Sequence, residues 1–226
     1  MHQFETYRQQ IVTACQELVE RGYLMATGGN VSLRVPEQNG FAITPSNYDY
    51  SKMTANDVCI LDLELKASAG QRAPSIESSL HATVYQTRPD VNAVVHTHQV
   101  YASALALINA PIPALFDEQA RFLGRSVEII PYAPSGTGFL KSNITKRIKN
   151  HHNAYILQNH GALCFGPDME QAIHNVEILE KCSLAYLLAL CTERKVTKIP
   201  LVVREIAFNK LRQDQKKVEH GEKEDR

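Results

Sequence analysis

The sequence predicts a single α/β domain in which helices cover the faces of a central sheet. Three observations support this prediction. Short apolar runs with strand character alternate with segments of helical periodicity, no repeat or linker divides the 226 residues, and a chain of this length can bury a full core. The apolar content of 44% and the charged content of 21% are those of an ordinary globular domain.

Helical periodicity is clearest in four parts of the chain. Apolar residues recur every three or four positions in the segments 4–21, 74–87, 101–108 and 169–194. Gly22 is expected to end the first helix, and Ser75 is a candidate N-cap for the second. The last segment is the longest predicted helix.

Strand-like apolar runs lie between these helices. They span residues 31–35, 41–44, 58–63, 91–96, 127–131, 154–158 and 162–165. We therefore expect one domain over residues 1–211. The segment 212–226 is polar and of mixed charge, so we expect it to be a frayed or disordered tail.

Charge and cysteine usage disfavour several classes of protein. Lys plus Arg and Asp plus Glu are balanced at 24 each, so no strong field favours nucleic acid or a membrane surface. Five cysteines are scattered without a CxxC pair, which is typical of reduced cytosolic thiols. Residues 1–5 lack the basic and apolar regions of a signal peptide, and no stretch is apolar enough to span a membrane. We therefore expect a soluble, cytoplasmic protein.

Two histidines one residue apart end the apolar run that begins at residue 91. Because side chains at i and i+2 share one face of a strand, His96 and His98 can both point at one ion. His160 follows a second apolar run and adds a third imidazole. Any one of them alone is more simply a hydrogen-bonded core histidine. Together, three neutral imidazoles suit a divalent cation such as Zn²⁺ and leave a position open for water or substrate, so the spacing predicts a catalytic metal site.

Three short segments offer hydrogen-bond donors to an anion. Gly29 lies in a Gly-Gly turn that can present backbone N–H groups, and Asn30 adds an amide donor. Ser46 and Asn47 follow the end of a predicted strand. Ser75 opens the second predicted helix, whose first N–H groups are unpaired. Each signal is weak alone, but together they predict a phosphate pocket built from backbone and neutral donors.

Glu77 lies in the first turn of that predicted helix. It either interacts with the helix dipole or lies between the phosphate pocket and the metal, where it would ligate the ion or accept a proton. Its apolar neighbour Ile76 is expected to raise its pKa. His81, one turn later, is either a spare ligand or a supporting and packing residue, and we favour the second interpretation.

The order and spacing of these blocks resemble the class II aldolase and adducin family. This family includes fuculose-phosphate and rhamnulose-phosphate aldolases and ribulose-phosphate 4-epimerase. The resemblance covers nearly the whole chain, and its most specific parts are residues 74–77, 88–91 and 94–98. The phosphate-binding segments depart from the family pattern at two positions: Ile76 stands where a second serine is usual, and Asn47 stands where glycine is common. The chain also has no phenol-bearing residue at 117–118, near which better-known members have one, and no tyrosine after Tyr186, although those members have one near the C-terminus. The second proton donor therefore stays open, and the candidates to line that side of the site are Asp117, Glu118, Gln119 and Arg121.

The resemblance implies a mainly antiparallel sheet and a metal site. It implies Zn²⁺, or else Mn²⁺ or another divalent ion, held by His96, His98 and His160, with Glu77 as both ligand and catalytic acid or base. It also implies phosphate contacts from Gly29, Asn30, Ser46, Asn47 and Ser75. Family members are commonly homotetramers with active sites at subunit interfaces, so we expect the same assembly here.

We therefore predict a lyase of carbohydrate metabolism. The expected enzyme is a zinc-dependent class II aldolase that reversibly cleaves a small ketose 1-phosphate to dihydroxyacetone phosphate and an aldehyde through a metal-stabilised enediolate. A sugar-phosphate 4-epimerase and a ketose-phosphate dehydratase would use the same metal site and remain alternatives. A Schiff-base aldolase is disfavoured because no lysine lies inside an apolar strand run. The non-enzyme alternative is an adducin-like interaction domain whose metal site has decayed.

Overall fold

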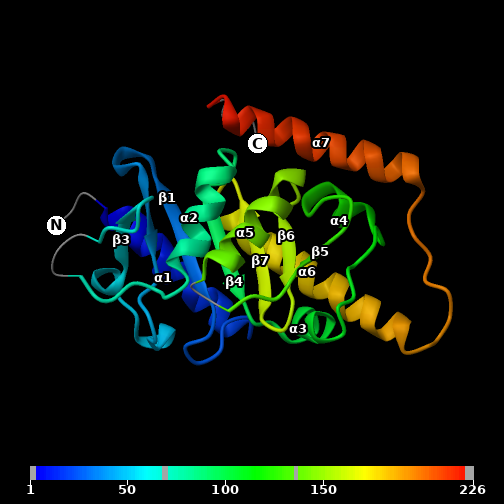
Figure 1. Ribbon diagram of the computed structural model, residues 1–226, viewed down its shortest axis with the longest axis horizontal. Helices are drawn as coiled ribbons and strands as arrows, with labels where there is room; N and C mark the ends of the chain where they lie inside the picture. Colours follow the sequence, from blue (N-terminus) through cyan, green and yellow to red (C-terminus); the bar gives the residue numbers. More distant parts are fainter. Residues whose placement is uncertain (1–3, 68–70, 135–136, 222–226) are drawn as a thin grey trace.

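A computed structural model of the chain describes residues 4–67, 71–134 and 137–221. Within these residues, one seven-stranded sheet has the order β3-β2-β1-β4-β7-β6-β5 (Figure 1). The strands are β1 (Asn30–Val35), β2 (Gly40–Ile43), β3 (Cys59–Asp62), β4 (Ala93–Thr97), β5 (Glu128–Ile130), β6 (Ala154–Leu157) and β7 (Gly161–Gly166). They coincide with the seven apolar runs of the sequence, apart from shifts at their ends.

The sheet is mainly antiparallel. Among the described strands only β5 and β6 pair in parallel, whereas β4 lies between β1 and β7 and is antiparallel to both. Side chains alternate between the faces, so that Val31 and Leu33 face one apolar cluster while Ser32, between them, faces α2 (Ser78–Thr87) on the other side. The predicted fold class is confirmed.

Helices cover both faces of this sheet. α1 (Glu5–Glu20), α3 (Val100–Leu107) and α6 (Met169–Leu190) pack on one face, and α2 and α5 (Gly138–Arg147) pack on the other. α4 (Asp117–Phe122) and α7 (Leu201–Glu219) pack against each other (Figure 1). None of the described helices combines the length and hydropathy needed to cross a bilayer.

α2 begins later than the sequence suggested. Ser78 is its first residue and Glu77 occupies the N-cap position, so the prediction that Ser75 caps this helix is wrong. Ser75 instead forms a turn ahead of the helix. Its carbonyl oxygen accepts hydrogen bonds from the backbone and side chain of Ser78 at 3.0 and 2.6 Å, and its hydroxyl oxygen accepts from the Glu77 N–H at 3.2 Å.

The segment expected to be a frayed tail is helical as far as Glu219, because it forms the second half of α7. Phe208, Leu211 and Gln215 recur at helical spacing and are buried. The surrounding charged residues conceal this stripe in the sequence, which is why the polar composition suggested a tail. Residues 222–226 lie outside the described part of the chain.

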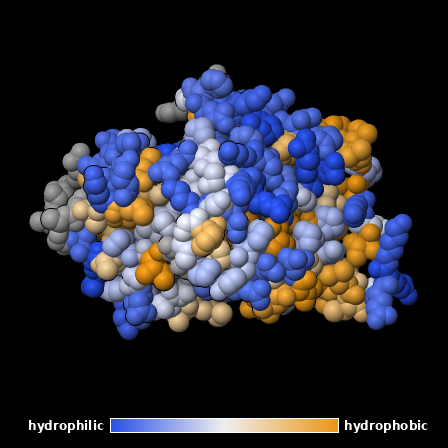
Figure 2. All heavy atoms as spheres, in the orientation of Figure 1, coloured by the Kyte–Doolittle hydropathy of each residue, from blue (hydrophilic) through white to orange (hydrophobic). Residues whose placement is uncertain are grey.

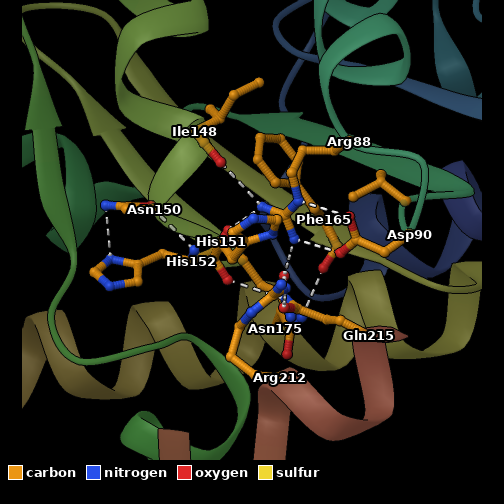
Figure 3. A network of polar contacts seen from close by, with 12 residues as sticks. Arg88, Asp90, Ile148, Asn150, His151, His152, Phe165, Asn175, Arg212 and Gln215 are labelled. Atoms are coloured by element: carbon orange, nitrogen blue, oxygen red, sulfur yellow. Dashed lines mark hydrogen bonds and ion pairs between the residues drawn. The ribbon is translucent and has the colours of Figure 1, made fainter. Parts of the chain in front are cut away.

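A buried ion pair at the end of α2 belongs to a polar network that reaches α7 (Figure 3). The Arg88 guanidinium donates to both carboxylate oxygens of Asp90, at 2.7 and 2.6 Å. Its remaining N–H groups donate to Asn153 and to backbone carbonyl oxygens in the segment before β6, so all five donors have acceptors. Asn153 also accepts a hydrogen bond from Gln215 of α7 at 2.9 Å. The pair therefore holds three separate parts of the chain together.

The variant Arg88→Met tests the contribution of this pair to stability. It leaves the buried Asp90 carboxylate without its cation, so we expect the free energy of unfolding to fall by about 3–5 kcal/mol in chemical denaturation. The control is Arg147→Met, which removes a partly exposed pair with Glu128 and should cost less than about 1 kcal/mol. Equal losses in the two variants would contradict this account.

Candidate functional site

The start of β1, the end of β4 and the start of β7 lie at the same end of the sheet, and the predicted ligands lie there. Asn30, the first residue of β1, pairs with His96 near the end of β4, and His96 pairs on its other side with Leu163 of β7. His98 follows β4 directly, and His160 directly precedes β7. The sheet register therefore brings together the three histidines that the sequence singled out.

The turn between β6 and β7 determines how His160 enters the site. Asn159 has a positive φ of 54°, a conformation that asparagine tolerates better than most residues. The backbone N–H of His160 closes the turn onto the end of β6 at 3.1 Å. At Gly161 an added Cβ would lie 2.4 Å from the Thr97 carbonyl oxygen and 2.6 Å from the His98 ring. The lack of a side chain at Gly161 therefore allows β7 to approach the end of β4.

The histidine nitrogens and the Glu77 carboxylate converge. His96 Nε2 lies 3.0 Å from His98 Nε2 and 3.2 Å from Glu77 Oε2, and His160 Nε2 lies 3.1 Å from Glu77 Oε1. One nitrogen from each histidine lies within 4.8 Å of the other two. His96 and Glu77 are buried, whereas His98 and His160 are partly exposed, so the cluster is open to solvent on their side.

The orientation of the His96 ring suits a cation. Its Nδ1 lies 2.8 Å from the Ala162 carbonyl oxygen and must donate to it, because a carbonyl oxygen only accepts. The neutral ring then directs the Nε2 lone pair toward His98 and the Glu77 carboxylate. A single proton would remove the repulsion between acceptor atoms in at most one of these contacts. A divalent cation between the three groups would remove it in all of them. Three imidazoles with one carboxylate are a donor set that fits zinc.

Burial keeps the rings of His96 and His98 neutral. It lowers the pKa of His96 to about 4, and it also lowers the pKa of His98. Both rings therefore carry free lone pairs near pH 7, the protonation state that a metal requires of a histidine ligand.

The protonation of Glu77 differs from the expectation. Burial alone raises the pKa of this carboxylate, but His96, His160 and the Asn30 amide outweigh it and bring the pKa below its usual value. The expected apolar wall is absent, because the Ile76 side chain is 74% exposed. Glu77 is therefore ionised at neutral pH, so it can ligate a cation or accept a proton.

The three predicted anion-binding segments are adjacent in space. The Ser46 N–H donates to the Ala73 carbonyl oxygen at 2.9 Å, and the Ser75 N–H donates to the Thr44 carbonyl oxygen at 3.1 Å. β1, which follows Gly29, pairs with β2 next to them. Asn47 has a positive φ of 50°, a conformation that glycine adopts freely. Contact of these segments with a phosphate group stays a prediction.

Two polar residues support the cluster from within the fold. Asn30 Nδ2 donates to Glu77 Oε2 at 2.7 Å, and Asn30 Oδ1 contacts His81 Nε2. The other ring nitrogen of His81 lies 2.6 Å from Ser32 Oγ. Because both nitrogens are engaged and the ring is fully buried, His81 is a supporting residue and not a spare ligand. Helical spacing placed it one turn from Glu77, but its contacts with β1 had no signal in the sequence.

Comparison with known proteins agrees with this geometry. A sequence profile of the Class II Aldolase and Adducin N-terminal domain matches residues 9–187. The chain belongs to the class II aldolase and adducin family.

Individual members of the family are similar over most of their length. The L-fuculose phosphate aldolase of Escherichia coli K12 is 37% identical over 182 residues, which are 79% of this chain and 83% of the relative. The 5-deoxy-D-ribulose 1-phosphate aldolase of Bacillus thuringiensis serovar kurstaki is 33% identical over 179 residues, again 79% and 83%. A solved L-fuculose 1-phosphate aldolase has a TM-score of 0.85 at 31% identity, and the match covers 92% of this chain and 96% of that one. With the family match, these relatives identify the chain as an aldolase, a carbon–carbon lyase.

The variant Gly161→Ala tests whether close approach at the β7 start assembles the cluster. The new Cβ would press on the backbone of β4 and on the His98 ring, so we expect the affinity for a divalent ion, measured with Zn²⁺, to fall by about 10–100-fold. Competition with a zinc chelator measures the affinity, and a melting curve shows that the variant is folded. Gly138→Ala is the control, because a Cβ at Gly138 meets nothing within 4 Å. Wild-type zinc affinity in Gly161→Ala would contradict the prediction.

Proposed function

We propose that the chain is a zinc-dependent aldolase that reversibly cleaves a small ketose 1-phosphate to dihydroxyacetone phosphate and an aldehyde. The observation that carries this proposal is the ionised Glu77 carboxylate, which lies within 3.2 Å of His96 and His160 nitrogens. A base beside a divalent-cation site is what proton transfer at a carbon next to a carbonyl group requires. The names of the fuculose-phosphate and deoxyribulose-phosphate relatives support a phosphorylated ketose as the substrate.

In this proposal His96, His98 and His160 hold the ion, and Glu77 is a fourth ligand. When bound, the ion supplies Lewis-acid chemistry that stabilises the negative charge left on the substrate as the carbon–carbon bond breaks. The imidazole donors favour Zn²⁺, although Mn²⁺ or another divalent ion suits the same site. The bond from His96 to the Ala162 carbonyl oxygen keeps the His96 donor atom aimed at the cluster.

Glu77 moves the proton. Its carboxylate is buried, and one oxygen accepts the Asn30 hydrogen bond while the other faces His160. In the synthetic direction Glu77 removes a proton from the hydroxymethyl carbon of dihydroxyacetone phosphate. In the cleavage direction it returns that proton to the same carbon once the bond to the aldehyde carbon has broken.

We propose that the substrate phosphate binds beside this carboxylate. The contacts would come from Gly29, Asn30, Ser46, Asn47 and Ser75. The adjacency of the three segments supports this, since donors from β1, the end of β2 and the turn before α2 meet in one region. Neutral side chains, with backbone N–H groups other than those of Ser46 and Ser75, would then bind the anion without a lysine or arginine cluster.

We propose a homotetramer with active sites at subunit interfaces. Six of the apolar side chains that are more than half exposed support an interface, and they are Leu107, Ile108, Leu188, Leu201, Val202 and Ile206. Figure 2 shows apolar surface gathered at the end of the molecule where α6 ends and α7 begins in Figure 1. Light scattering should give four times the 25.3 kDa chain mass, and a monomer would contradict the assembly.

We also propose a cytoplasmic location. All five cysteines are free, and four of them are buried, which suits a reducing compartment. No nucleic acid or membrane partner is proposed, because the net charge is zero and acidic and basic residues are balanced.

An assay of the zinc- or manganese-loaded protein against ketose 1-phosphates tests the reaction. The panel contains fuculose, rhamnulose, ribulose and 5-deoxyribulose 1-phosphates, and release of dihydroxyacetone phosphate is measured. We expect release from at least one member and its loss when a chelator removes the metal. Metal-loaded protein that releases none would exclude the aldolase proposal for these substrates and favour an epimerase or dehydratase on the same site.

Two substitutions separate the roles of the ligands and the base. Glu77→Gln should keep the metal and lose turnover by about 10²–10⁴-fold, because the amide cannot accept the proton. His96→Ala should lose metal and turnover together. Elemental analysis and the aldolase assay measure both properties, with Glu17→Gln and His174→Ala, on α1 and α6, as controls. Normal turnover in Glu77→Gln, or a metal-loaded active His96→Ala, would refute the corresponding role.

A further inference from the structure

A continuous chain of buried polar side chains leads to the metal cluster. In order, it consists of Tyr85, Ser32, His81, Asn30 and Glu77. The four successive contacts measure 2.7, 2.6, 2.5 and 2.7 Å. Two members are one turn apart on α2 and two alternate along β1, so the helix and the strand present them to each other. Every member is buried.

The orientation of the Asn30 amide sets the direction of the hydrogen bonds in this chain. The Asn30 nitrogen donates to Glu77 Oε2, so the Asn30 oxygen faces His81. An amide oxygen only accepts, so His81 must carry its proton on Nε2.

The direction continues beyond the ring. The His81 ring is fully buried and its two nitrogens contact only a hydroxyl group and an amide, so the ring is neutral and its Nδ1 is an acceptor. The Ser32 hydroxyl therefore donates to Nδ1, and the Tyr85 hydroxyl donates to Ser32. Only one tautomer of His81 is compatible with the contacts on both sides of it.

We propose that His81 is a positioning residue, whose Nε2–H holds the Asn30 amide with its nitrogen toward Glu77 and so fixes the Glu77 carboxylate beside the three histidines. The inference rests on the proposed function, because this orientation affects turnover only if Glu77 transfers a proton.

The other tautomer shows why this matters. With the proton on Nδ1, His81 would direct a lone pair at the Asn30 oxygen, and the amide would turn to bring its nitrogen to His81. The Asn30 oxygen would then face the Glu77 carboxylate, which would lose its donor and meet a repulsive dipole. The hydrogen bond that Glu77 accepts, four contacts from Tyr85, thus depends on the position of a single proton on His81.

The first experiment measures the tautomer in the wild-type protein and requires neither substrate nor variant. Nitrogen-15 NMR of histidine- and asparagine-labelled protein should show a neutral His81 protonated on Nε2. It should also show one strongly downfield Asn30 amide proton, which donates to Glu77. A cationic His81 or one protonated on Nδ1 would overturn the proposal, as would an unshifted Asn30 amide.

The second experiment compares two substitutions at the same position. His81→Leu removes the donor, so we expect kcat to fall by about 10–100-fold, with metal content and KM little changed and the shifted Asn30 resonance lost. His81→Gln carries an amide N–H that can reach the Asn30 oxygen, so it should restore most of kcat and the resonance. The matched control is His152→Leu, which replaces another buried histidine, labelled in Figure 3; it precedes the start of β6, whereas His160 follows the other end of this strand.

Combining variants tests whether His81 acts through Glu77. In a Glu77→Gln background, His81→Leu should cause no further loss of kcat, whereas independent roles would give additive losses. Additive losses would overturn the proposal, as would equal activity in His81→Leu and His81→Gln or a loss of metal that accounts for all lost turnover. If the wild type cleaves no ketose phosphate, the proposed function fails, and the NMR measurements still decide whether His81 orients Asn30.

Discussion

The hydrogen-bonded position of β4 between β1 and β7 is the constraint on which the site depends. The pairings of His96 with Asn30 and with Leu163 decide which side chains meet at the end of the sheet that carries the histidine cluster. Because side chains alternate along a strand, a register slip of one residue would turn His96 to the opposite face of the sheet. The geometry of the ligands is therefore established by the backbone ladder, and side-chain contacts adjust it only locally.

Two buried polar groups in this fold differ in a way that separates structure from chemistry. Around Arg88 every donor has an acceptor and the charge is balanced by Asp90, so nothing further is needed there. Around His96 the facing groups are imidazole nitrogens and a carboxylate, a set of donor atoms that suits a cation. Both groups are buried and rich in contacts, and they differ in that a cation is built into the first and would fit the second.

Features that depend on local periodicity were predicted well from the sequence. The seven strands follow from apolar runs of a few residues. The position of His96 and His98 together at one strand end follows from the alternation of side chains along a strand. α4, α5 and α7 were not predicted, since their apolar stripes are short or masked by charge; Leu211 and Gln215 are buried by contacts with distant segments. The start of α2 was misplaced because the hydroxyl of Ser75 serves a turn as well as it would serve a cap. The contacts of His81 depend on β1, some 50 residues away, and had no local signal.

The residues of the histidine cluster come from distant parts of the sequence, so the cluster forms only late in folding. His96 contacts Ala162 across a separation of 66 residues, and Glu77 and Asn30 meet across 47. Partly folded chains that form only local helices and hairpins hold His96 near His98 but lack the rest of the cluster. A ligand that needs the whole cluster thus binds the native state almost alone, and at a hundred times its dissociation constant it would add about 2.7 kcal/mol to the free energy of unfolding. Because the parts of the site are far apart in the sequence, binding of such a ligand would distinguish the completely folded chain from partly folded ones.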